Sequence, residues 1–126
     1  MTAPAPVVTV LVCDDDAMIR EALREVLDAQ PGVSVIALAG DGAEAAALAW
    51  RHAPAVALLD VRMPGGGPGA AREIRRRSPG TRILAFSAHD DADTVARMRE
   101  AGASDYLVKG APNAILIEAI RRLAAS

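Results

Sequence analysis

The chain has 126 residues, a formal net charge of −2, and a composition in which 52% of residues are hydrophobic but only 2% aromatic. This length predicts one domain over residues 1–126, with a core built from Val, Leu, Ile and Ala. The slightly acidic charge argues against direct nucleic-acid binding by the domain, the single cysteine excludes an internal disulfide, and no apolar run approaches the ~20 residues that span a bilayer.

Residues 1–6 contain two prolines, Pro4 and Pro6, and no basic residue. Proline interrupts regular structure, and a signal peptide normally opens with basic residues. We therefore expect a short loose tail at the N-terminus, no membrane segment, and a protein of the reducing cytoplasm.

The first regular elements are an apolar strand over residues 7–13 and an amphipathic helix over residues 17–29. Asp16 directly precedes the helix and is expected to cap it, and Pro31-Gly32 ends it. Helical spacing gathers the apolar side chains on one stripe, which we expect to face the core: Met18, Ile19, Ala22, Leu23, Val26 and Leu27.

Four more pairs of a strand and a helix follow. Asp41 opens an alanine-rich helix that continues to Arg51, and we expect Trp50 to pack within it. Four arginines between positions 72 and 77 predict a solvated helix face. Strands are predicted over 33–38, 55–59, 82–86 and 105–108, and further helices over 69–77, 92–101 and 114–124.

This alternation predicts an α/β fold of the flavodoxin-like, doubly wound type. Strands joined through helices require right-handed crossovers and a parallel sheet that is covered on both faces. Five such units fit a five-stranded sheet of order 2-1-3-4-5 with five helices. Ligands bind such a fold at the carboxyl ends of the strands, where the strand order reverses.

Polar residues follow four of the five predicted strands, and all of them are expected at that edge: Asp14 and Asp15, Asp60, Ser87, and Lys109. Three carboxylates crowded together raise one another's pKa unless a cation lies among them. Oxygen ligands of this kind suit Mg²⁺, whereas no His or Cys is placed to favour zinc. A carboxylate can also attack phosphorus and form an acyl phosphate, with its charge neutralised by a metal and an ammonium group.

Four motifs in this order resemble the receiver domain of two-component response regulators, over about residues 7–123. They are Asp14-Asp15, Asp60-Val61-Arg62-Met63-Pro64, Ser87-Ala88 and Tyr106-Leu107-Val108-Lys109. The resemblance implies the CheY-like form of the fold. It also implies a protein that is not an enzyme, apart from assisting its own phosphoryl transfer and dephosphorylation.

The resemblance assigns roles to the matching residues. Asp60 would accept the phosphoryl group, and Mg²⁺ would be bound by Asp14, Asp15, Asp60 and the backbone carbonyl of Arg62. The phosphodonor would be a sensor histidine kinase or a phosphotransfer protein.

The remaining matches concern the response to phosphorylation. Ser87 and Lys109 would contact the phosphoryl group, Ser87 and Tyr106 would act as a switch, and Arg62 and His89 would tune phosphoryl loss. The face formed by the fourth helix, fifth strand and fifth helix would then control an output domain or a partner, including a second copy in a homodimer.

Two features depart from the family pattern. Gly110 follows Lys109 where a proline is common, and residues 63–69 lack the usual Asp-Gly or Asn-Gly before the third helix.

Two rival classes remain at this point. A receiver-like scaffold that is never phosphorylated is disfavoured by the complete acidic set with its lysine. A flavodoxin-like enzyme or cofactor binder is disfavoured because the sequence has no Gly-rich dinucleotide fingerprint and almost no aromatic residues.

Overall fold

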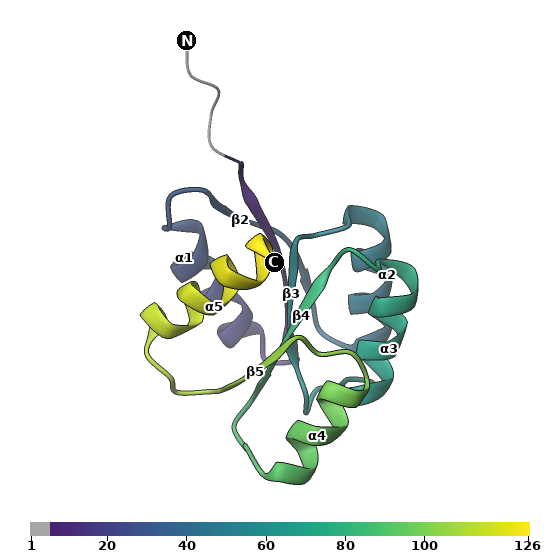
Figure 1. Ribbon diagram of the computed structural model, residues 1–126. Coiled ribbons are helices and arrows are strands. Elements are labelled where there is room, and N and C mark those ends of the chain that lie inside the picture. The colour runs from purple at the N-terminus through teal and green to yellow at the C-terminus, as the bar shows by residue number, and fades with distance from the viewer. Residues whose placement is uncertain (1–5) are drawn as a thin grey trace.

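The computed structural model describes residues 6–126, in which strands and helices alternate along the chain (Figure 1). The five strands form one parallel sheet of order β2-β1-β3-β4-β5, which confirms the predicted fold. Of the predicted N-terminal tail, residues 1–5 lie outside the described part of the chain. The elements are β1 Val8–Cys13, α1 Ala17–Asp28, β2 Val33–Ala39, α2 Gly42–His52, β3 Val56–Asp60, α3 Gly67–Arg77, β4 Arg82–Ser87, α4 Ala92–Glu100, β5 Asp105–Val108 and α5 Asn113–Ala125.

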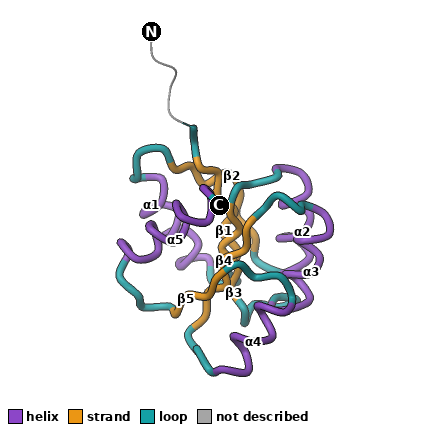
Figure 2. The backbone as a smooth tube through the Cα atoms, in the orientation of Figure 1, coloured by secondary structure: helices purple, strands orange, loops and turns teal. Residues whose placement is uncertain are grey.

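The helices cover both faces of the sheet, α1 and α5 on one side and α2, α3 and α4 on the other (Figure 2). Because side chains alternate along a strand, β1 sends Val10 and Val12 into the core beneath α1 and α5, and Leu11 and Cys13 into the core on the other side. The central strand β3 is buried along its whole length. The sheet is therefore a rigid platform whose strand ends can hold side chains in fixed positions.

Aspartates begin three of the five helices. The side chain of Asp16 accepts hydrogen bonds from the backbone N–H groups of Met18 and Ile19, as predicted, and Asp41 accepts one from Glu44. Asp91 does the same for α4, through Thr94. No helix within residues 6–126 has the length and apolar composition that a membrane span requires.

The start of α3 differs from the prediction. The helix begins at Gly67, two residues before the expected position, and Pro68 lies in its first turn. Proline fits the first turn because the N–H that it lacks would have no partner within the helix. A Gly-Pro pair therefore opens this helix, where the sequence suggested a continuing loop.

Three residues that were predicted to be buried, Met18, Ala22 and Trp50, are instead at the surface. The side chain of Met18 is 82% exposed and that of Trp50 is 69% exposed. Along α1, burial increases toward the C-terminal end, where Leu27 is fully buried, and Ala22 is also exposed. Periodicity indicates which side of a helix is apolar, but it does not show how much of that side a neighbouring element covers.

Candidate functional site

Strand register brings two aspartates level with each other at the carboxyl edge of the sheet. Cys13 of β1 pairs with Leu59 of β3, and the next residue in each strand is an aspartate, Asp14 or Asp60. These strands are neighbours at the point where the strand order reverses, which is the usual ligand site of the fold.

Three carboxylates converge at this edge. Oxygens of Asp14, Asp15 and Asp60 all lie within 4.8 Å of one another. Asp14 and Asp60 are only 1% and 2% exposed, whereas Asp15 is exposed. Carboxylate oxygens are ligands that suit Mg²⁺, an ion that also retains several waters. The donor set therefore suits Mg²⁺, and Asp15 lies on the open side of the cluster, where water has access.

Lys109 reaches back into the acidic cluster from the end of β5. Its Nζ donates to Asp14 Oδ2 at 2.8 Å and lies 3.4 Å from Asp60 Oδ2. The same Nζ lies 5.5 Å from the centre of the Phe86 ring. Burial alone would lower the pKa of Lys109, but the hydrogen bond with Asp14 and the charges of Asp60 and Asp14 raise it. Lys109 is thus held in its charged form beside both aspartates.

The environment of Asp60 opposes its ionisation. Burial raises the pKa of Asp60 above its usual value, and the charge of Asp14 acts in the same direction. The backbone N–H of Arg62, which donates to Asp60 Oδ1 at 3.1 Å, and the Lys109 ammonium both lower it, but they do not cancel the effect of burial. A carboxylate here needs additional positive charge to be fully stabilised.

Ser87 is linked to Tyr106 through the backbone of His89. The hydroxyl oxygen of Ser87 accepts a hydrogen bond from the His89 N–H at 3.2 Å. The carbonyl of His89 accepts one from the Tyr106 hydroxyl at 2.5 Å. Ser87 is completely buried, and its own carbonyl accepts from the backbone N–H of Lys109 at 2.7 Å. The loop after β4 therefore connects the predicted phosphoryl-contacting hydroxyl with the predicted switch residue.

The structure brings four of the predicted site residues together in one cluster: Asp14, Asp15, Asp60 and Lys109. The backbone carbonyl of Ser87 accepts a hydrogen bond from the N–H of Lys109, which connects Ser87 to this cluster. The side chains of Arg62 and His89 are exposed, and both residues enter the site through backbone groups. Gly110, after Lys109, has a φ of +96°, a conformation that proline cannot adopt. This turn therefore differs in shape from one with proline at that position.

Sequence reasoning missed the contribution of Arg20. Its Nη1 donates to the backbone carbonyl of Asp14 at 2.7 Å, so that α1 fixes the chain at the acidic cluster. Helical spacing places Arg20 away from the apolar stripe of α1, and no short motif marks an arginine that folds back toward the end of a strand.

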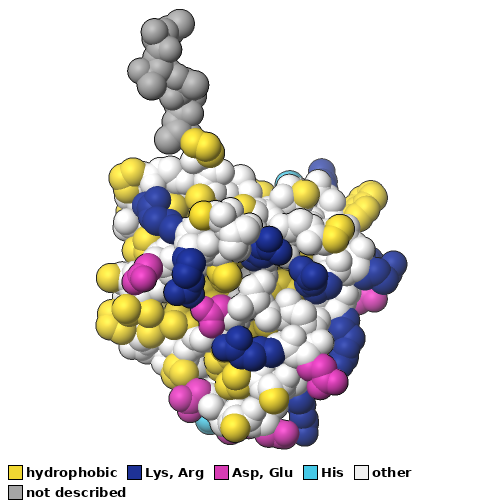
Figure 3. Space-filling model, viewed as in Figure 1, with side chains coloured by type: hydrophobic (Ala, Val, Ile, Leu, Met, Phe, Trp, Pro, Cys, Tyr) yellow, Lys and Arg dark blue, Asp and Glu magenta, His cyan; other side chains and the backbone are white. Residues whose placement is uncertain are grey.

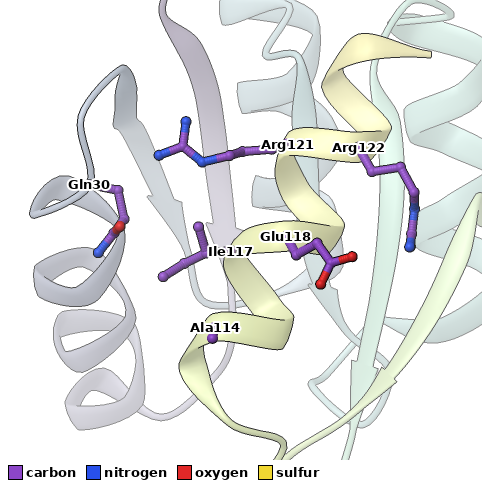
Figure 4. A pocket seen from close by; sticks show the side chains of 6 residues that line it. All are labelled: Gln30, Ala114, Ile117, Glu118, Arg121 and Arg122. Atoms are coloured by element: carbon purple, nitrogen blue, oxygen red, sulfur yellow. The ribbon is translucent and has the colours of Figure 1, made fainter.

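A separate pocket lies between the C-terminal end of α1 and helix α5. It has a volume of about 620 Å³, and Figure 4 shows Ile117 pointing toward α1. Arg121 bridges the two sides by donating to the carbonyl of Pro31 at 3.0 Å. The pocket contains none of the acidic cluster, so it is not part of the candidate site. Its lining residues are Gln30, Ala114, Ile117, Glu118, Arg121 and Arg122.

The model of the response regulator receiver domain family matches residues 10–121, nearly the whole chain. The chain belongs to this family. Receiver domains are typically phosphorylated on an aspartate and bind Mg²⁺ at an acidic pocket, and this chain has an aspartate cluster at the corresponding edge of its sheet, formed by Asp14, Asp15 and Asp60.

Individual relatives agree with this assignment. The receiver domain is 38% identical over 122 residues to the transcriptional regulatory protein NarL of Mycobacterium tuberculosis, and 34% identical over 118 residues to DegU of Brevibacillus brevis. These matches cover 95% and 93% of the chain but 56% and 50% of the relatives, so the chain spans about half their length. The solved signal receiver domain of M. tuberculosis NarL superposes with a TM-score of 0.92 at 36% identity, covering 97% of this chain and 99% of that one.

Proposed function

We propose that Asp60 of this receiver domain accepts a phosphoryl group in a reaction that requires Mg²⁺. The observation that supports it best is the convergence of three carboxylates and one ammonium group at the strand ends. Asp60 is the candidate acceptor because it ends the central strand β3 within the acidic cluster, with Lys109 Nζ 3.4 Å from its Oδ2.

The donor is a phosphohistidine of a sensor kinase or of a phosphotransfer protein. A carboxylate oxygen of Asp60 forms a bond to phosphorus as the bond between phosphorus and the imidazole nitrogen breaks. The electron pair of that bond returns to the imidazole, which takes up a proton, and the product is an aspartyl phosphate.

The residues of the site position and neutralise the groups that react. Asp60 is held by the N–H of Arg62 at Oδ1, which leaves Oδ2 toward Lys109. The Lys109 ammonium can move from Asp60 to the incoming phosphoryl oxygens, and Ser87 can offer its hydroxyl to them. When bound, Mg²⁺ would be held by Asp14, Asp15, Asp60 and the Arg62 carbonyl, and it would neutralise charge on the phosphoryl oxygens.

Phosphorylation then changes the face formed by α4, β5 and α5. A phosphoryl group adds negative charge that attracts Ser87 and Lys109. Because the loop after β4 joins Ser87 to Tyr106 through His89, movement of Ser87 changes the position of Tyr106 on β5. Phosphorylation in this way shifts the populations of two conformations.

Surface ion pairs on the same face can rearrange easily. Asp105 of β5 pairs with Arg122 of α5 at 2.5 Å and lies 3.7 Å from a nitrogen of Arg99 at the end of α4. Such partly exposed pairs contribute little to stability, so a partner can exchange them at small cost. We infer that this face regulates an output domain or a partner, or forms a homodimer.

The acceptor is tested by labelling with radioactive acetyl phosphate. The parent protein is expected to incorporate phosphate with Mg²⁺ but not with excess EDTA, and Asp60→Asn is expected to incorporate none. Asp28→Asn is the matched control, because Asp28 lies at the end of α1, outside the acidic cluster, and its Oδ1 accepts from the N–H of Val35. Labelling of Asp60→Asn at the parent level would reject Asp60 as the acceptor.

A further inference from the structure

The only tryptophan of the chain lies on the surface, near the C-terminal end of α2. Trp50 is 69% exposed, and the buried hydrophobic residues that form the core do not include it. A large indole in this position does not stabilise the core of the domain. Exposed tryptophans are strongly enriched among the residues that dominate protein–protein binding energy.

Two arginines line a pocket together with this indole, and a third follows it in the chain. Trp50, Arg76 and Arg77 line an open pocket of about 370 Å³, and Arg51 follows Trp50 in the chain. All three arginines are exposed. Figure 3 shows Lys and Arg side chains gathered over the side of the molecule formed by α2 and α3. We call Trp50, Arg51, Arg76 and Arg77 the Trp50 patch.

Contacts within the domain account for part of this charge. Arg76 forms two hydrogen bonds with Glu73, and Arg77 Nε lies 3.2 Å from the same carboxylate. Basic residues in the last turns of α2 and α3 also suit the negative ends of the helix dipoles. One carboxylate cannot balance three guanidinium groups, however, and no ion pair involves Arg51 within residues 6–126. The patch therefore retains positive charge around an apolar centre.

The Trp50 patch lies far from the acidic cluster. Helices α2 and α3 begin at the carboxyl edge of the sheet, after β2 and β3, and run back toward the amino edge. Trp50, Arg76 and Arg77 are in their last turns, opposite Asp60. They are also separate from the face of α4, β5 and α5 that we assign to the phosphorylation response.

We propose that the Trp50 patch is a docking site for an acidic segment of a partner protein. The segment places one aliphatic or aromatic side chain against the indole, and its carboxylates pair with the guanidinium groups of Arg51, Arg76 and Arg77. A guanidinium group binds a carboxylate through two parallel hydrogen bonds, so the contact fixes the orientation of the two groups and also pairs their charges. Because the patch and Asp60 lie at opposite ends of the sheet, this docking does not depend on phosphorylation.

An acidic protein segment suits this surface better than nucleic acid does. Proteins that bind single strands usually stack successive bases on several aromatic residues along a basic groove. Here one indole is available, and the domain as a whole has a net charge of −2. The patch therefore suits a short protein segment in which one apolar side chain lies between acidic residues.

The test uses fluorescently labelled synthetic peptides rich in Asp and Glu around one Leu, Ile, Phe or Trp. Matched peptides carry Asn and Gln in place of the acids, and binding is followed by fluorescence anisotropy. At least one acidic peptide is expected to bind more tightly than its amide counterpart, and its affinity is expected to fall at high salt. Trp50→Ala is expected to weaken that binding by about tenfold or more, as is the double change Arg76→Gln with Arg77→Gln.

Two matched controls separate docking from general effects. Met18→Ala removes another exposed apolar side chain, on α1, and Arg24→Gln with Arg97→Gln removes two exposed arginines that are paired within their own helices. Both controls are expected to bind like the parent, and so is Asp60→Asn. The proposal is overturned if no acidic peptide outcompetes its amide counterpart, if Trp50→Ala binds normally, or if a single-stranded oligonucleotide binds more tightly than every peptide.

Discussion

Asp60 combines a buried position with the proposed role of phosphoryl acceptor, which requires a negative charge. Because burial raises its pKa, the protonated form is favoured by folding. Its contribution to stability is therefore complete below the ordinary aspartate pKa of about 3.9 and is lost as the pH rises through the higher value of the folded state. At neutral pH, without a divalent cation, the ionised Asp60 destabilises the domain.

The raised pKa of Asp60 predicts that Asp60→Asn is more stable than the parent at neutral pH in EDTA. The amide has no charge to bury, and its oxygen can still accept from the N–H of Arg62. The advantage should shrink as the pH falls toward about 4, where the parent is protonated as well. Urea unfolding at a series of pH values measures the difference. A less stable variant at pH 7, or a difference that does not change with pH, would contradict the effect of burial.

For individual residues, the sequence predicts which side chains lie close together, but it does not predict which of them form hydrogen bonds with backbone carbonyls. Asp14, Asp60 and Lys109 follow parallel strands, so topology alone brings them to one edge. The hydrogen bonds from Arg20 to the Asp14 carbonyl and from Tyr106 to the His89 carbonyl depend on the exact path of two loops. Sequence patterns do not determine that path.

At the scale of elements, the start of α2 is closely packed against the loop that follows Asp60. The N–H of Gly42 donates to the carbonyl of Pro64 at 2.9 Å. A Cβ atom on Gly42 would lie 1.6 Å from the carbonyl oxygen of Gly65, which is far inside van der Waals contact. Only glycine allows the two backbones to approach this closely.

We predict that Gly42→Ala lowers the free energy of unfolding by about 1–3 kcal/mol, as overpacking of a filled site commonly does. The control is Gly69→Ala in α3, where an added Cβ would meet no atom within 4 Å. That change should be neutral or stabilising by up to about 1 kcal/mol, because alanine favours helix. Urea unfolding compares the two variants, and equal stabilities would show that the loop moves away freely.

Helical periodicity predicts the burial of some side chains correctly and of others wrongly. Helical spacing in the sequence predicts an apolar stripe on α5 at Leu116, Ile117, Ile120 and Leu123, and all except the half-buried Ile117 are buried. Met18 and Trp50 fit their helical patterns equally well but are exposed. Each lies near one end of its helix, where coverage depends on how far neighbouring elements extend, and the sequence of one helix does not contain that information.

For the molecule as a whole, the strand order was predictable because strands alternate with helices and the connections between parallel strands are right-handed. The site follows from that order, since it makes β1 and β3 neighbours in the sheet. The acidic cluster consequently joins residues that are far apart in the sequence, and a cation bound there stabilises the fold and the site together.

This coupling predicts that Mg²⁺ raises the stability of the whole domain. A ligand that binds only the folded state adds RT ln(1 + [L]/Kd), or about 2.7 kcal/mol at one hundred times the Kd. Thermal unfolding of the parent should therefore shift upward with Mg²⁺ concentration. Asp15→Asn should need a higher concentration for the same shift, because it removes a charged ligand on the open side of the cluster. Asp28→Asn, remote from the cluster, should follow the parent curve. An equal shift for Asp15→Asn and the parent would mean that Mg²⁺ acts elsewhere on the surface.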